Sequence, residues 1–525
     1  MEVRAAAGGS RSRWAAALVV LAVLLLSAAT VVRYTVDYLQ ADGVQQSVMS
    51  VQDVDLFFWG QNRFAALVSA LASPVANPVA NLVLCLMINA VAFHVVLLLL
   101  ASMGSRVVTG ARGIWPTALL FLVMTASVHA VMAPAKLHIF ALESQPYSVS
   151  WGAALGAFLL WKRRTWWTML LAVALVGVAV GVNQSTILGA AFLAVIEAVR
   201  RRQWVRWPVF GVVWGVWFGV WALLSAKFGG NAGPIPDANQ EYFRFDLPAL
   251  VNGASHSVTS IFEAFRPVRF IALLVVAALC LVLVPSDRRS ALLPRLGLAT
   301  AFGGLYWAVF TGNPWVAENG FVVRYFFPVV VLLLVALAAS VAAALVALTQ
   351  LAVTYAPRVR AGGVRASVVR GIAVGATAVA AGLALVGPVS APSNATVLVQ
   401  TRATADFARA NGITFISGYY WDMWPVLHRA LTDGRHAAFV VAFKSGGDPA
   451  AYHRAFDAEL ARPGQPPRAM CVNDTLDVCR TYLDYWTRPG WVDTGATCPV
   501  PGTSPQLGSP PERSCRVLEY SGAAA

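Results

Sequence analysis

The sequence predicts a polytopic α-helical membrane protein that carries a small polar α/β domain at its C-terminus. Of its 525 residues, 58% are hydrophobic and only 12% are charged, whereas a soluble domain has roughly 25% charged residues. The mean hydropathy is +0.64, and the apolar residues gather in about eleven long windows that stop before the polar last quarter. We therefore expect a transmembrane domain in residues 1–389 and a separate domain in residues 390–525.

The apolar windows define the expected membrane helices, each of which needs about 20 mostly apolar residues. The first window could be a signal peptide, because Arg4, Arg11 and Arg13 precede it. Its apolar core is longer than that of a signal peptide, so we expect an uncleaved first span. The predicted spans are 14–33, 78–101, 114–133, 147–161, 167–183, 184–199, 208–226, 268–285, 295–311, 325–350 and 370–389.

The distribution of basic residues predicts the orientation of these spans. If the N-terminus is cytoplasmic, the connecting segments on that side carry 19 Lys or Arg residues against two acids. Since positive charge is retained on the cytoplasmic side of a membrane, this orientation is favoured, and the C-terminal domain is then extracytoplasmic. Residues 390–525 hold twelve basic and twelve acidic side chains, so the net charge of +14 belongs to the membrane part. No clustered basic surface indicates a nucleic-acid partner.

Four cysteines lie in the C-terminal domain: Cys471, Cys479, Cys498 and Cys515. In an oxidising compartment they predict two disulfides, with three connectivities open. A zinc site is the alternative, but the spacing lacks the C-x2-C pair that structural zinc sites usually contain. Disulfides also agree with the extracytoplasmic placement that the charges predict.

The remaining pattern of residues 390–525 is typical of a small α/β domain. A helical pattern over 401–411 ends at Gly412, and the apolar run 413–417 predicts a strand. A second strand is expected within 437–443, and the Pro, Gly and Ser residues of 499–514 predict a loop. Alternation of helix and strand favours α/β packing.

The first external loop, residues 34–77, carries two neighbouring carboxylates, Asp53 and Asp55. A carboxylate at the membrane surface can take a proton from a sugar hydroxyl or hold a divalent cation. In an extended segment the two side chains would share a face, whereas on a helix they would diverge. The alternative is that they are ordinary acids of an external loop. The following stretch, 63–71, predicts a helix that lies along the membrane surface.

Three short motifs and the overall architecture resemble the GT-C superfamily of membrane glycosyltransferases. The run 52–63, with its Phe-Phe-Trp-Gly-Gln-Asn-Arg segment, is similar to one in bacterial multi-span proteins grouped with that superfamily. The Arg324-Tyr325 pair at the outer end of a span and the stretch 418–422 resemble further GT-C features. The resemblance implies inverting transfer of a hexose or pentose from a polyprenyl-phosphate donor. The acceptor would be an envelope glycan, lipid or protein at the outer face of the bacterial cytoplasmic membrane.

The resemblance also implies that an acid of the first loop is the catalytic base, and Asp53 or Asp55 matches it, with Asp53 preferred. Acids of later loops, Glu143, Glu241 and Glu318, are the next candidates. Arg324 and Arg63 could bind a lipid phosphate bidentately, or could simply anchor the chain at the interface. The candidate substrate-binding residues are Trp59, Gln61, Arg63, Lys136, His138, Glu143, Arg324, Tyr325, Tyr420 and Trp421. A divalent Mg or Mn ion is compatible with the paired carboxylates.

Other function classes are less consistent with the sequence. It contains no Walker loop, no dinucleotide-binding glycine motif and no H-E-x-x-H sequence. A polysaccharide polymerase or ligase that uses external arginines such as Arg244 and Arg266 is one alternative. A lipid-linked sugar transporter or flippase is another, although transporters place polar groups at the bilayer midplane on broken, repeated helices.

Overall fold

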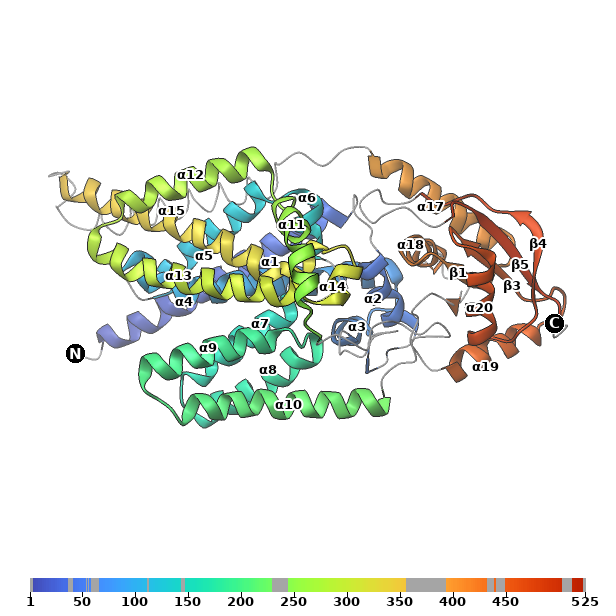
Figure 1. Ribbon diagram of the computed structural model, residues 1–525, viewed down its shortest axis with the longest axis horizontal. Helices are drawn as coiled ribbons and strands as arrows, with labels where there is room; N and C mark the ends of the chain where they lie inside the picture. The colour runs from blue at the N-terminus through green and yellow to red at the C-terminus, as the bar shows by residue number, and fades with distance from the viewer. Residues whose placement is uncertain are drawn as a thin grey trace.

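The computed structural model shows a helical bundle joined at one end to a domain that contains a β-sheet (Figure 1). A narrow layer of short helices lies between the two parts, with the bundle on one side and the C-terminal domain on the other. The structure describes residues 3–35, 41–52, 54, 56–57, 66–110, 113–142, 147–228, 244–355, 393–431, 439–440, 449–502 and 512–522.

Five helices within these ranges contain a stretch long and apolar enough to cross a membrane. They are α1 (Val3–Thr35), α4 (Pro78–Thr109), α5 (Ile114–Val131), α10 (Arg206–Phe228) and α15 (Phe327–Tyr355). Further helices complete the bundle: α7 (Tyr147–Trp161), α8 (Trp166–Val182), α9 (Thr186–Arg201), α12 (Pro267–Leu283) and α13 (Ser286–Thr311). The predicted helical membrane protein is confirmed. The number of eleven spans stays a prediction, and both the span 370–389 and the boundary at residue 390 lie outside the described residues.

Helix α4 shows how local sequence sets the ends of these helices. Asn77 precedes it, and its side-chain oxygen accepts hydrogen bonds from the backbone N–H groups of Val79 and Ala80 at 3.1 and 3.0 Å. Pro78 occupies the first turn, where its missing N–H has no cost. Gly110 ends the helix with a φ of 71°, a conformation that suits glycine.

The layer between bundle and domain consists of short elements. They are α2 (Ala41–Gln52), α3 (Ala66–Ala72), α6 (Pro134–Ala141), α11 (Leu247–Phe262), α14 (Pro314–Glu318) and the 3-10 helix η2 (Val323–Phe326). Helix α3 overlaps the stretch 63–71, for which an interfacial helix is predicted, and residues 63–65 lie outside the described part. Helix α2 was not predicted: its apolar positions Val44, Val48 and Met49 share one face but stand among many polar residues.

Polar contacts with the bundle explain why α2 is a buried helix. Asn81 of α4 donates to Ser50 Oγ at 2.8 Å, and Asn89 of α4 donates to Gln46 Oε1 at 3.1 Å. Ser69 of α3 donates to the backbone carbonyl of Gln46 at 2.9 Å. Since buried polar groups are stable only with partners, these contacts allow a polar helix to pack inside the protein.

The C-terminal domain has a five-stranded mixed sheet with the strand order β2-β1-β3-β5-β4. The first three strands in that order are parallel, whereas β5 is antiparallel to both β3 and β4. The strands are β1 (Phe415–Gly418), β2 (Phe439–Val440), β3 (Arg468–Val472), β4 (Trp491–Thr497) and β5 (Cys515–Tyr520). The predicted α/β character is confirmed, and β1 corresponds to the predicted strand 413–417.

Two hydrophobic layers cover the two faces of this sheet. Ile416 belongs to the layer formed with α17 (Ser393–Ala410) and α18 (Tyr420–Leu431), whereas Phe415 belongs to the layer formed with α19 (Pro449–Leu460) and α20 (Leu476–Trp486). This follows from the alternation of side chains along a strand. The layer with α17 and α18 also includes Val44, Val48 and Met49 of α2, so one hydrophobic core joins the domain to the first loop.

Two disulfides select one of the three connectivities that the sequence leaves open. Cys471 of β3 is bonded to Cys479 of α20, and Cys498, after β4, is bonded to Cys515 at the start of β5. The disulfide prediction is therefore confirmed.

Peptide mapping of the unreduced protein is expected to recover Cys471 linked to Cys479 and Cys498 linked to Cys515. Replacing both members of the Cys498–Cys515 pair by Ala should lower the free energy of unfolding by about 3 kcal/mol, and replacing the other pair by about 2.5 kcal/mol, since the stabilisation grows with loop length. Denaturant unfolding monitored by tryptophan fluorescence measures both. Recovery of a peptide that links Cys479 to Cys498 would contradict this pairing.

Candidate functional site

The carboxylate of Asp42, in the first turn of α2, connects three distant parts of the chain. Arg324 Nη1 of η2 donates to Asp42 Oδ2 at 2.7 Å, and the hydroxyl of Tyr420 in α18 donates to Asp42 Oδ1 at 2.6 Å. The first loop, the end of a membrane helix and the C-terminal domain thus meet at one acidic group. We call the group of Asp42, Gln45, Arg324 and Tyr420 the junction cluster.

Gln45 completes the junction cluster one helical turn after Asp42. Its Oε1 lies 2.5 Å from the Tyr420 hydroxyl oxygen, while its buried Nε2 has no hydrogen-bond partner among the described residues. Since the tyrosine has one proton, it cannot donate fully to both Gln45 and Asp42. When the amide is turned so that Nε2 donates to the tyrosine oxygen, the phenolic proton is directed at Asp42, and the amide oxygen of Gln45 then occupies the buried position without a partner.

The ion pair within the cluster is almost fully removed from solvent. Asp42 is 2% exposed and Arg324 is 8% exposed. The guanidinium of Arg324 also lies 5.3 Å from the ring centre of Tyr325 and 6.0 Å from that of Trp421. Aromatic faces attract such a cation. Desolvation strengthens the attraction between the two charges, and it makes the loss of either partner costly.

The turn between β1 and α18 presents Tyr420 and Trp421 to the cluster. Gly418 has a φ of +143°, and a Cβ at this position would collide with the backbone of Val472 in β3. Only glycine suits that conformation and that close approach. Asp422 then accepts a hydrogen bond from Asn473 Nδ2 at 2.9 Å, which fixes the first turn of α18 to the sheet.

The structure brings together four of the residues that the sequence nominates: Arg324, Tyr325, Tyr420 and Trp421. Lys136 and His138 lie on α6, which packs against η2. Burial lowers the pKa of His138 to about 3, so its imidazole is neutral at pH 7. Glu318 is exposed at the end of α14. Several predicted residues lie outside the described part of the chain: Asp53, Asp55, Trp59, Gln61, Arg63, Glu143 and Glu241.

Asp42 and Gln45 are residues of this site that the sequence reasoning missed. Within the first loop, residues 34–77, the sequence predicts a helix only over 63–71, and the acids that it nominates are those of the run 52–63. The pattern Asp42-x-x-Gln45-Gln46 places three polar side chains on one face of a helix. That spacing, close after the first apolar span, was the signal that could have identified them.

No protein-family model and no curated protein sequence matches this chain. The geometry of the site limits the chemistry that it can perform. It contains a carboxylate held in one orientation, a guanidinium that could bind a phosphate, and aromatic faces beside both. Among the described residues, no three His, Cys, Asp or Glu side chains gather as metal ligands. The described carboxylate of the cluster is bound by a guanidinium, which is not the oxygen-rich environment that a divalent cation requires.

Replacing Arg324 by Gln is expected to destabilise the protein by about 3–5 kcal/mol, because it leaves the Asp42 charge buried without its guanidinium. Adding Asp42→Asn to this variant should recover part of the loss, which gives a coupling energy in a double-mutant cycle. Thermal unfolding in detergent measures each step. The matched control is the exposed Arg488–Asp457 pair, which has the same 2.7 Å separation. Arg488→Gln there should cost at most about 1 kcal/mol, and equal effects at the two sites would contradict the assigned burial of the junction cluster.

Stability should decrease as pH rises from about 4 to 6, because burial raises the pKa of Asp422 from its ordinary value near 3.8 to about 6. The folded chain holds this proton more tightly than the unfolded chain, so the contribution is present below pH 4 and is lost as pH passes 6. Asp422→Asn should flatten this part of the profile while keeping the bond to Asn473. Unfolding temperatures measured from pH 4 to 7 test this; an unchanged slope in the variant would contradict it.

Proposed function

We propose that this protein is a membrane glycosyltransferase that uses a polyprenyl-phosphate sugar as its donor, with the junction cluster at the centre of its active site. The observation that carries the proposal is the buried Asp42 carboxylate, bound by Arg324 and Tyr420 where the first loop, η2 and the C-terminal domain meet. This combination supplies the first-loop acid and the phosphate-binding cation that such a reaction needs. The resemblance of the Arg324-Tyr325 pair and of the stretch 418–422 to GT-C features adds support.

Asp42 is the base that we assign to the reaction. As the acceptor hydroxyl attacks the anomeric carbon, its proton passes to the carboxylate, and the bond from that carbon to the phosphate oxygen breaks on the opposite side. Displacement from the opposite side inverts the anomeric centre. Tyr420 holds one carboxylate oxygen in place, so the other oxygen keeps a defined direction toward the acceptor. Asp53 and Asp55 remain the alternative bases.

Arg324 is the group that we assign to the departing phosphate. In the structure its charge is satisfied by Asp42, and the pair is closed to solvent. A donor phosphate would compete with Asp42 for the guanidinium, since arginine binds phosphate and carboxylate with the same fork geometry. Binding of the donor would then release Asp42 Oδ2 and make the base available only when a donor is present. The charge pattern of the connecting segments favours an extracytoplasmic position for this reaction.

Asp42→Asn is expected to reduce sugar transfer by about 10²–10⁴-fold, the usual contribution of a general base, while polyprenyl phosphate still binds. Release of polyprenyl phosphate from a panel of labelled hexose and pentose donors in membrane vesicles reports transfer, and native mass spectrometry reports binding. Arg324→Gln should instead weaken the binding of polyprenyl phosphate.

The matched control is Asp246→Asn, at the start of α11 on the same end of the bundle, which should leave transfer unchanged. The double variant of Asp53 and Asp55 to Asn separates the two assignments of the base. If this variant loses transfer and Asp42→Asn retains it, the base lies in the later part of the loop. If all these variants keep full activity, the proposed reaction is wrong.

A further inference from the structure

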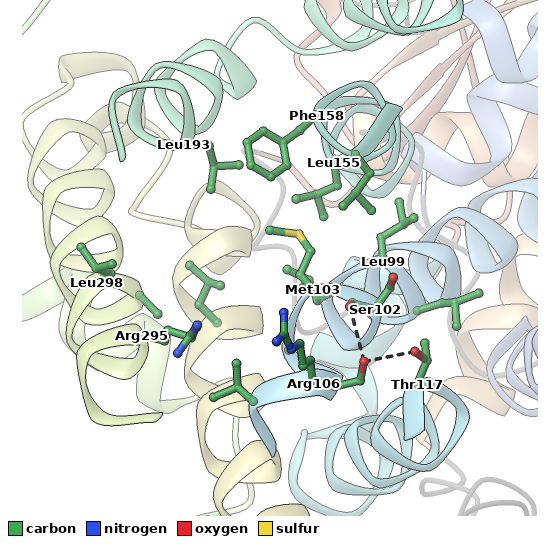
Figure 2. A pocket seen from close by; sticks show the side chains of 18 of the residues that line it. Leu99, Ser102, Met103, Arg106, Thr117, Leu155, Phe158, Leu193, Arg295 and Leu298 are labelled. Atoms are coloured by element: carbon green, nitrogen blue, oxygen red, sulfur yellow. Dashed lines mark hydrogen bonds between the residues drawn. The ribbon is translucent and has the colours of Figure 1, made fainter. Parts of the chain in front are cut away.

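A second site lies at the end of the bundle opposite the C-terminal domain. A cavity of about 1470 Å³ opens there between α4, α7, α9, α13 and α15. Figure 2 shows its interior, where Leu99, Met103, Leu155, Phe158 and Leu193 form an apolar wall. The volume exceeds the roughly 300–1,000 Å³ of an ordinary small-molecule pocket, and an apolar lining of this size suits hydrocarbon chains.

Basic side chains are concentrated at one end of this cavity. Arg106, Lys162, Arg200, Arg288 and Arg295 line it, against the two acids Glu197 and Asp287. Lys162, Arg200 and Arg288 lie at or beside a helix end, and Arg295 lies in the third turn of α13. Arg106 is near the end of α4, which begins beside α2. At 1.5 Å per residue, Arg106 lies about 42 Å along α4 from Pro78. Since this distance exceeds a hydrocarbon core of about 30 Å, the cavity mouth and the junction cluster belong to opposite membrane surfaces.

The acids of the cavity neutralise only part of this charge. Glu197 pairs with Lys162 at 3.0 Å and with Arg200 at 3.9 Å. Arg295 donates to the backbone carbonyl of Ala291 on its own helix. Within the described ranges, the side chain of Arg106 forms neither a hydrogen bond nor an ion pair.

Arg106 and Arg295 therefore converge without a carboxylate between them. Figure 2 shows both side chains directed into the same space from α4 and α13. The positive charges of Arg200 and Arg106 both act on Arg295. Two converging guanidinium groups repel each other unless an anion lies between them. The shape and the charge of the cavity thus suit a single ligand that has an anionic head and apolar chains.

We propose that this cavity binds an anionic phospholipid of the membrane leaflet opposite the C-terminal domain. Its phosphate would lie between Arg106 and Arg295, and its acyl chains would occupy the apolar part between Leu155 and Leu193. Basic pockets between membrane helices bind such headgroups, and the surplus of basic residues predicts that this leaflet is the cytoplasmic one. The apolar part of the cavity reaches Phe327 and Pro328 in the first turn of α15, whereas its basic end lies far along α4 from the junction cluster. The proposal does not depend on the reaction assigned to that cluster.

Native mass spectrometry of the full chain, stripped of lipid in detergent, tests the proposal. Phosphatidylglycerol should bind at least tenfold more tightly than phosphatidylcholine, because the head of the latter carries a compensating positive charge. Replacing Arg106 and Arg295 together by Gln should weaken phosphatidylglycerol binding roughly thirtyfold. The corresponding Lys pair, which keeps both charges, should stay within a few-fold of the original affinity.

The control is the Gln pair at Arg163 and Arg164, which lie at the same end of the bundle but outside the cavity lining; it should not change binding. Equal binding of the two phospholipids, or an unchanged affinity in the Arg106 and Arg295 variant, would overturn the proposal. If a polyprenyl phosphate bound more tightly than phosphatidylglycerol, the proposal would be wrong and the cavity would be a site for the carrier lipid. If inorganic phosphate displaced phosphatidylglycerol at equal concentration, the proposal would also be wrong, because the acyl chains would then add no affinity. The comparison of lipids uses the unaltered chain, so it decides the question even if the Gln pair does not fold.

Discussion

The ion pair between Asp42 and Arg324 is the interaction on which the arrangement of the two parts of the molecule depends. Its members are 282 residues apart, and both are buried where the bundle meets the C-terminal domain. Neither charge could remain there alone, because an isolated buried charge costs several kcal/mol. The hydroxyl of Tyr420 ties the same carboxylate to α18, so first loop, bundle and domain must be correctly placed for any one of the three to be stable.

Packing around the ion pair also makes helix α2 depend on both the bundle and the C-terminal domain. Ten of the twelve residues of α2 are buried, some against α4 through amide and hydroxyl groups and others against Trp424 and Leu427 of α18. A helix of such polar composition has little stability of its own in isolation. It forms because Asn81 and Asn89 supply partners on one side and the C-terminal domain supplies an apolar surface on the other.

This dependence explains what could be predicted from the sequence. The long apolar helices, β1 and the two disulfides follow from composition, period and cysteine number, all of which are local properties. Arg324, Tyr325, Tyr420 and Trp421 were found because each stands in a short motif. Asp42 was not found, because nothing near it in the sequence reveals Arg324 or Tyr420. Helix α2 was missed for a related reason: its partners Asn81 and Asn89 lie on a different helix, and only the folded chain brings them together.

The junction cluster is closed in this structure, and that closure bears on how a reaction could be controlled. A carboxylate that accepts bonds from both a guanidinium and a phenol has neither oxygen directed at another hydroxyl. Transfer of Arg324 to a competing phosphate would free Oδ2, while the bond from Tyr420 would keep the carboxylate in position. The same contact that joins the domain to the bundle would thus keep the carboxylate unreactive until an anionic lipid substrate arrived. Trp421 of the C-terminal domain lies beside the guanidinium. Movement of Arg324 toward a phosphate would therefore also change its contact with that domain.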